Sequence, residues 1–271
     1  MPLLVRTWNV FHGNTQPPER RAYLEEMVRL ASADRPDVLC LQEVPAWALS
    51  ELSGWSGMQA YGEIAQRPTL GPLPSTAAIS RAITSLHHGL FRSALAGQAN
   101  AILLAPAIRV TDRRVLALNP RRFRRAQARW LRLGLAAQLA WAKERRLCHA
   151  VHVDFSDGRA GVVANLHATS FPADQRLADA EALRAAVFVD ALVRHRDLCI
   201  LAGDFNVSAA RSRTLSDLSS PEWGFSTPGS GIDHVLVRGT AASPPVRWSA
   251  ARRAQNGRVL SDHAPVEVRI E

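Results

Sequence analysis

The sequence repeatedly places a small cluster of polar residues at the end of an apolar run. Residues 198–201 are apolar throughout and lead into Gly203-Asp204-Phe205-Asn206. A run of this kind, bounded by turn residues, is typical of a buried strand that delivers its last side chains to the edge of a sheet. Five further strand ends carry such residues, namely Asn9, Glu43, His167, Asp233, and Asp262 with His263. We therefore expect several buried strands to end close together and chemistry to occur at that edge.

These polar groups are suited to a hard divalent cation. Carboxylate and amide oxygens favour Mg²⁺ or Mn²⁺ over zinc. Two imidazoles, His167 and His263, are expected at the same edge as these carboxylates, and a carboxylate partner fixes the tautomer of a histidine and raises its basicity. Cys40, Cys148 and Cys199 lie inside apolar runs without metal-ligand spacing. They predict free, buried thiols in a reducing compartment.

Seven segments resemble, in the same order, the motifs of the endonuclease/exonuclease/phosphatase superfamily, in its deoxyribonuclease and sphingomyelinase-like branch. Any one motif alone is weak, but seven in order are specific, and they cover nearly the whole chain. The segments are Thr7-Trp8-Asn9-Val10, Leu41-Gln42-Glu43, Asn100-Ala101-Ile102-Leu103, Asn165-Leu166-His167, Gly203-Asp204-Phe205-Asn206, Ile232-Asp233-His234 and Ser261-Asp262-His263-Ala264-Pro265-Val266. The resemblance implies an α/β fold, a four-layered αββα sandwich of two packed mixed or antiparallel sheets flanked by helices.

The resemblance also assigns roles by position. Three residues are expected to hold the metal: Glu43, with Asn9 beside it and Asp262 contributing. Five are expected to be catalytic: His167, Asp204, Asn206, Asp233 and His263. Asp204 and Asn206 would flank the attacking water, while Asp233 would orient His263. His167 would donate to the phosphate, as histidine does in the deoxyribonuclease, sphingomyelinase and phosphatase branches, whereas abasic-site endonucleases usually carry tyrosine there.

Each motif also has an ordinary structural interpretation. Gly-Asp-x-Asn and Ser-Asp-His are common turns stabilised by local hydrogen bonds. Glu43 could stabilise the dipole of a helix that begins near Pro45, and His167 could be a core histidine with satisfied hydrogen bonds. Glu63 is a candidate carboxylate partner for His167 or an exposed strand residue. His12, His87 and His88 have no assigned role and are expected on the surface or in loops.

The length of 271 residues fits one domain spanning 1–271, because no linker-like stretch separates the motifs. Apolar residues at helical spacing predict helices over Pro18 to Ala33 and Pro172 to Arg196. The N-terminus reaches Arg6 too early to hold the apolar segment of a signal peptide, and no apolar run approaches the length of a membrane span, so a cytoplasmic location is expected. Nothing in the sequence indicates a protein partner, and we expect a monomer.

The net charge of +9 favours an anionic partner. All but one of the 33 basic residues are arginine, a bias that a genome rich in G and C also produces. Charge is most concentrated between Arg113 and Arg132, where eight arginines occur without an acidic residue. From Arg121 onward this stretch belongs to an apparent basic insertion around 119–143, placed between the strand at 100–104 and the strand at 147–155. As one helix, the insertion would carry Trp130 and Trp141 on a shared face.

The insertion has two interpretations. It is an outer helix that buries both tryptophans against the sheet, or an arm that contacts substrate through Arg121, Arg122, Arg124 and Arg125. A basic amphipathic arm could bind a nucleic-acid backbone or an anionic membrane surface.

Together these features predict an Mg²⁺-dependent hydrolase of phosphodiester bonds that acts by metal-assisted attack of water. Nucleic acid is the favoured substrate, with a phospholipid or a small molecule such as an inositol phosphate as the alternative. A catalytically silent protein that binds nucleic acid or membrane on the same fold is the competing class. The presence of Glu43, Asp204 and His263 argues against it.

Overall fold

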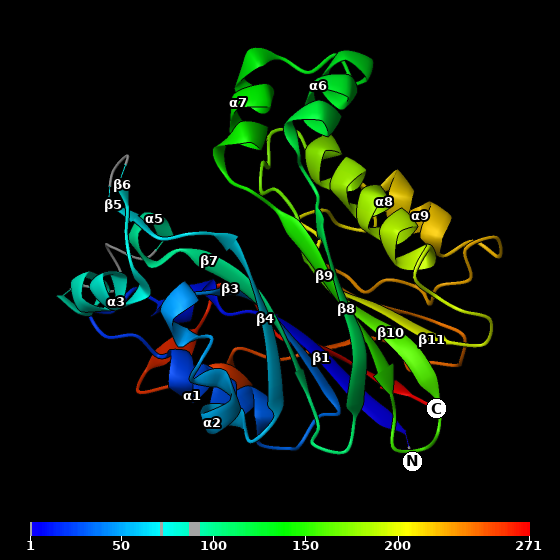
Figure 1. The fold of residues 1–271 in the computed structure, drawn as a ribbon, viewed down its shortest axis with the longest axis horizontal. Helices are drawn as coiled ribbons and strands as arrows, with labels where there is room; N and C mark the ends of the chain where they lie inside the picture. Colours follow the sequence, from blue (N-terminus) through cyan, green and yellow to red (C-terminus); the bar gives the residue numbers. More distant parts are fainter. Residues whose placement is uncertain (1, 71–72, 87–92) are drawn as a thin grey trace.

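The chain folds into two large β-sheets in the computed structural model, which describes residues 2–70, 73–86 and 93–271 (Figure 1). The six-stranded sheet contains, in spatial order, β13 (Val246–Arg247), β16 (Val266–Ile270), β1 (Leu3–Asn9), β3 (Val38–Val44), β7 (Gln98–Leu104) and β4 (Gln59–Gln66). The five-stranded sheet contains β12 (Asp233–Arg238), β11 (Leu198–Asp204), β10 (Ala160–His167), β9 (Leu147–Asp154) and β8 (Arg109–Ala117).

Smaller elements complete the fold. β14 (Ala254–Gln255), β15 (Arg258–Leu260) and β2 (Thr15–Gln16) form a small sheet, and β5 (Thr69–Leu70) pairs with β6 (Leu73–Pro74). The described α-helices are α1 (Leu24–Ser32), α2 (Leu52–Ser56), α3 (Ala77–Leu86), α5 (Ser93–Ala96), α6 (Arg121–Trp130), α7 (Leu135–Lys143), α8 (Arg176–Asp190) and α9 (Arg213–Leu218).

The central strands are apolar on both faces because each face is covered. Along β3, Val38 and Cys40 belong to the core between the two sheets, whereas Leu39 and Leu41 pack with residues of α1 and α2. This division follows from the two-residue period of a strand. On the far side, α8 and α9 pack against the outer face of the five-stranded sheet. The layers are therefore helix, sheet, sheet, helix, as the predicted sandwich requires.

Both predicted helices exist but are shorter than their sequence ranges. α1 begins at Leu24, because the chain before it runs through β2 and two prolines. α8 begins at Arg176, after a turn in which the Asp174 carboxylate accepts from the Arg176 amide at 3.2 Å. It ends at Asp190, before a turn in which Arg196 has a φ of 70°.

Strand direction gathers the polar clusters at one edge. β1 runs parallel to β3 and β10 runs parallel to β11, so their carboxyl ends point the same way. β7, β9, β12 and β16 are antiparallel to these strands, so their first residues lie at that same edge. Asp233 therefore opens β12 and His263 precedes β16. The expectation that every cluster follows an apolar run is wrong for these two, because an antiparallel strand brings its start to the edge where its neighbour ends.

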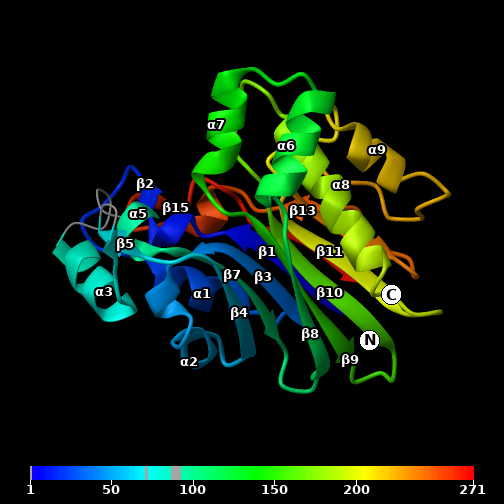
Figure 2. The same ribbon diagram turned by 45° about the horizontal axis from the view of Figure 1, so that its top comes forward.

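The basic insertion differs from its sequence prediction. Of the arginine-rich stretch between Arg113 and Arg132, the first two arginines lie before the predicted insertion, on the edge strand β8. The insertion itself forms two helices, α6 and α7, rather than one, because the chain turns at residues 131–134, where Arg132 has a φ of 50°. Trp141 is buried but Trp130 is 79% exposed, so the prediction of a shared tryptophan face is wrong. The two helices form a hairpin that projects beyond the sheets (Figures 1 and 2).

The three cysteines are free and buried, as predicted. Burial raises the pKa of the Cys199 thiol to about 12 and also raises the pKa of the Cys40 and Cys148 thiols. Thiols with such pKa values stay protonated and unreactive near neutral pH. Within residues 2–70, 73–86 and 93–271, no helix combines the length and the apolar character that crossing a membrane requires.

Candidate active site

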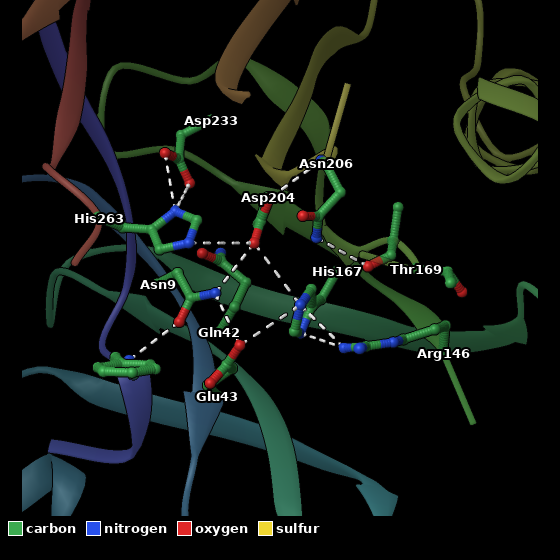
Figure 3. Close-up of polar contacts among 12 residues, drawn as sticks. Asn9, Gln42, Glu43, Arg146, His167, Thr169, Asp204, Asn206, Asp233 and His263 are labelled. Carbon is green, nitrogen blue, oxygen red and sulfur yellow. Dashed lines mark hydrogen bonds and ion pairs between the residues drawn. The ribbon is translucent and has the colours of Figure 1, made fainter. Parts of the chain in front are cut away.

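Six of the predicted residues meet at the shared strand edge (Figure 3). Asn9 ends β1, Glu43 lies near the end of β3, His167 ends β10 and Asp204 ends β11, while Asp233 and His263 arrive from strand starts. These residues are separated by up to 254 positions along the chain, from 9 to 263. The parallel strand pair β1–β3 of one sheet and the parallel pair β10–β11 of the other therefore form the site together.

Asn9 joins two carboxylates. Its side-chain amide donates to Glu43 Oε1 at 3.1 Å and to Asp204 Oδ2 at 2.9 Å, while its Oδ1 accepts from the Phe11 amide at 2.9 Å. Asn9 is fully buried. It thus holds the acids of both sheets on either side of one amide nitrogen.

Asp233 orients His263. His263 Nδ1 lies 2.9 Å and 3.0 Å from the two carboxylate oxygens of Asp233, and its Nε2 is directed toward Asp204 Oδ2 at 3.8 Å. Burial acts to lower the pKa of His263, but the charges of Asp204 and Asp233 outweigh it and raise this pKa to about 10. Burial in turn raises the pKa of the Asp204 carboxyl. The pair can therefore hold a proton between a buried acid and an oriented imidazole.

Glu43 occupies a strained backbone position. Its φ is 54°, a left-handed value that non-glycine residues adopt rarely, and it lies where the pairing of β3 with β7 shifts register between Leu41 and Val44. Its Oε2 lies 3.2 Å from His12 Nε2. Burial acts to raise the pKa of Glu43, but the hydrogen bond and charge of His12 keep it well below the usual range. Of the two positions expected for His12, surface or loop, the structure shows the second: it lies in the turn Phe11–Gly13 after β1, with its side chain buried at this site. His87 and His88 lie outside the described residues.

His167 is held by an amide and a guanidinium. Gln98 Nε2 lies 2.7 Å from His167 Nδ1, and Arg146 Nη1 lies 2.9 Å and 2.8 Å from the two ring nitrogens. Burial and the charge of Arg146 lower the pKa of His167 well below its usual value. Glu63, the sequence candidate for its partner, is instead paired with Arg113 at 3.1 Å on the adjoining sheet edge. His167 is therefore suited to act as a neutral group beside a permanent cation.

Arg146 was missed by sequence reasoning. It precedes β9, is only 7% exposed, and donates through Nη2 to Glu144 at 2.6 Å. Its Nε is buried without a hydrogen-bond partner in the described part of the chain. Nothing in the run Glu144-Arg145-Arg146 distinguishes one arginine from the other, because only the alternation of β9 decides which side chain points inward.

The remaining predicted residues lie around this group. Asn206, with a φ of 51°, donates its backbone amide to Asp204 Oδ1 at 2.9 Å and its side-chain amide to the Ala168 carbonyl at 3.0 Å. Asp262 is exposed next to His263. The four arginines proposed for the arm lie on α6, and none of them lines the cleft described below.

A cleft of about 540 Å³ opens beside the site. It is bounded on one side by strand-edge residues and on the other by the end of α7. Its lining is formed by Phe11, His12, Glu43, Gln98, Ala140, Lys143, Glu144, Arg146, Thr169, Ser170 and Phe171. A phosphate group entering here would meet Arg146 and Lys143, with the Glu43 carboxylate in the same lining.

A buried polar bridge holds the two sheets in register beneath the cleft. Gln42 Nε2 donates to Asn165 Oδ1 at 2.7 Å, and Asn165 donates to the carbonyls of Leu41 and Ala101 at 2.9 Å each. Buried polar groups specify a particular arrangement because leaving them unpaired is costly. The bridge links β3 to β10, the strands that carry Glu43 and His167.

Metal-binding geometry is present in part of the cluster. Asp204, Asp233 and His263 each offer a ligand atom, and these atoms lie within 4.8 Å of one another. This group differs from the predicted set of Asn9, Glu43 and Asp262, although Asn9 bonds both Glu43 and Asp204. Together the two sets supply the oxygen-rich donors that Mg²⁺ or Mn²⁺ prefers.

The profile of the Endonuclease/Exonuclease/phosphatase family matches residues 7–263. The chain belongs to this family. The predicted resemblance and the predicted fold class are thereby confirmed. Family members hydrolyse phosphoester bonds, so the chain belongs to a family of hydrolases. No curated relative matches the chain.

Solved structures of the same fold match over the whole chain. The human Nocturnin catalytic domain with bound sulfate anion is 14% identical, with coverage of 100% of this chain and 93% of that one and a TM-score of 0.65. A functionally unknown conserved protein from Enterococcus faecalis is 14% identical, with coverage of 99% of each chain and a TM-score of 0.65. A family protein from Beutenbergia cavernae is 18% identical, with coverage of 100% and 71% and a TM-score of 0.64. At these identities the matches establish the fold alone.

Proposed function

We propose that this chain is a divalent-metal-dependent phosphodiesterase. The observation that carries the proposal is the contact between an oriented imidazole and a buried acid, His263 with Asp233 and Asp204, beside a cleft that also contains Arg146. An acidic cluster suited to a cation, next to permanent positive charge, fits an anionic ester whose hydrolysis develops charge on the phosphoryl oxygens.

The position of each side chain indicates its role in the proposed reaction. Asp204, held by Asn9, orients and deprotonates the attacking water, and His263 exchanges a proton with the reacting group while Asp233 fixes its tautomer. His167 and Asn206 donate to the phosphoryl oxygens. Mg²⁺ held by Glu43, with Asn9 and Asp262 beside it, or by the Asp204 group, would polarise the phosphoryl group.

The test is a metal-dependent activity panel over plasmid DNA, RNA, abasic duplex DNA, phospholipid vesicles and inositol phosphates. We expect hydrolysis of at least one diester with Mg²⁺ or Mn²⁺ and none with EDTA. The matched control is His263→Ala, which retains the cleft but loses the imidazole. Hydrolysis that survives in this variant at the wild-type rate would contradict the proposed role of His263. No hydrolysis of any substrate would favour a silent binding protein.

Two substrate classes follow from different observations. The net charge of +9 favours nucleic acid, whose backbone charge dominates its affinity for proteins. A phospholipid is the second candidate, and the exposed apolar residues on the α6–α7 hairpin favour it.

A further inference from the structure

The α6–α7 hairpin carries charge of one sign. Residues 119–143 contain seven basic residues and no acidic one. Arg121, Arg122, Arg125, Arg129 and Arg132 are exposed, and no ion pair joins them to an acidic residue in the described part of the chain. Elsewhere on the surface many arginines are paired, such as Arg109 with Asp154 and Arg176 with Asp174. The hairpin is therefore an uncompensated cationic surface.

The same hairpin exposes large apolar side chains. Trp130 is 79% exposed, Leu135 72% and Leu139 62%. Trp130 and Leu135 flank the turn that forms the hairpin tip, residues 129–135, and Leu139 lies one helical turn further along α7. Exposed apolar groups gathered at the end of a projecting element mark an interaction surface rather than ordinary surface variation.

The tip is held firmly, so its exposure is built into the fold. Leu133 is buried with Ala128, Ala137 and Trp141 in a small core beneath the turn. The Leu131 carbonyl accepts from Arg176 Nη1 at 3.0 Å, and Trp141 Nε1 donates to Glu181 Oε1 at 2.5 Å. α8 thus anchors both helices while the side chains of Trp130 and Leu135 remain exposed.

We propose that the hairpin tip docks on an anionic lipid surface. Tryptophan and leucine next to unpaired arginines suit the boundary between headgroups and acyl chains. A nucleic-acid surface would pair with the arginines but leave both leucines without a partner, since such interfaces are polar. Arg129 and Arg132 lie at the tip itself, where they reach anionic headgroups as the apolar side chains enter the lipid.

The docking would bring the cleft to the headgroups. α7 runs from Leu135 at the tip to Lys143 at the cleft, about 12 Å at 1.5 Å per residue. Interfacial segments bury their apolar side roughly 5–10 Å deep, which places Lys143 near the level of the headgroup phosphates. Resting on the proposed phosphodiesterase function, this geometry favours a phospholipid as the substrate.

The experiment measures binding of the full chain to vesicles of phosphatidylcholine with and without phosphatidylglycerol, in EDTA so that no turnover occurs. We expect binding only when phosphatidylglycerol is present. Trp130→Ser with Leu135→Ser should weaken the partition coefficient by on the order of tenfold or more, because buried apolar area is lost. Arg129→Gln with Arg132→Gln should weaken it roughly 25-fold, about fivefold for each arginine.

Two double variants serve as controls. Leu73→Ser with Ile79→Ser removes exposed apolar groups of β6 and α3, and Arg29→Gln with Arg109→Gln removes the same net charge elsewhere. Both should bind vesicles within about twofold of wild type, because neither touches the tip. Equal partition of wild type and the Trp130 double variant would overturn the proposal, as would wild-type binding that ignores phosphatidylglycerol.

A fluorescent oligonucleotide provides the opposing measurement. If Arg129→Gln with Arg132→Gln leaves vesicle binding intact but flattens the salt dependence of oligonucleotide affinity, the surface binds nucleic acid and the lipid proposal is wrong. Thermal unfolding of each variant checks the fold, and exposed side chains should leave it nearly unchanged. Vesicle binding is measured without metal, so a failure to bind vesicles does not contradict the phosphodiesterase proposal. Likewise, a lack of hydrolytic activity does not contradict a positive binding result.

Discussion

Arg146→Met should cost the enzyme most of its affinity for the phosphoryl group. The guanidinium has five N–H donors, and the protein uses one toward His167 and one toward Glu144. Three donors are left, among them the buried Nε–H. A phosphoryl group in the cleft can accept from those that face it, whereas methionine keeps the length of the side chain but removes the donors and the charge.

The expected size of this loss follows from the burial of the Arg146 side chain. A hydrogen bond to a charged group contributes about 1.5–3 kcal/mol, and at 7% exposure little solvent screening reduces it. Because each 1.4 kcal/mol corresponds to a factor of ten, we expect kcat/KM to fall by roughly 10- to 150-fold. Arg146→Lys should recover part of this loss, because an ammonium keeps the charge but not the planar arrangement of donors.

The assay compares kcat, KM and competitive inhibition by inorganic phosphate with a saturating metal. The control is Arg145→Met, in the neighbouring residue, whose side chain is exposed and donates to the Ile64 carbonyl at 3.5 Å. That variant should stay within about twofold of wild type. If Arg146→Met remains folded and binds phosphate as wild type does, Arg146 has no role in binding substrate.

Three further outcomes are expected. Glu43→Gln should raise the Mg²⁺ concentration required for activity, with partial recovery at high metal; an unchanged metal dependence would remove Glu43 from the metal site. His263→Ala and Asp204→Asn should each lower turnover by a factor on the order of 10² or more with little change in KM, and near-normal turnover in either variant would refute that residue's role. In metal-free protein the folded-state pKa of His263, about 10, lies above the ordinary value of 6.5. Its stabilising charge is therefore fully present below that ordinary value and is lost as pH rises toward 10. The difference in unfolding free energy between wild type and His263→Gln, measured with urea, should thus shrink across this range, and a constant difference would contradict the pKa shift.

The structure of the basic insertion could not be predicted from local sequence patterns. Helical spacing of Trp130 and Trp141 suggested one continuous helix, yet the chain turns between them and only Trp141 is buried. The turn is stabilised by Leu133 packing beneath it and by the bond from Arg176, a residue far away in the sequence. β8 was overlooked because an edge strand with one exposed face carries charges that hide its strand period.

What the sequence by itself determined is the set of strand-end clusters and, through their order, the sandwich and the family. Those signals are local: an apolar run predicts a buried strand, and the polar residues beside it mark the edge. Only the tertiary structure decided that Asp233 and His263 arrive from strand starts, that His12 pairs with Glu43, and that Gln98 and Arg146 hold His167. The physical reason is that strand direction and register are decided by pairing between distant segments. No local pattern records which of two adjacent arginines will face the cleft.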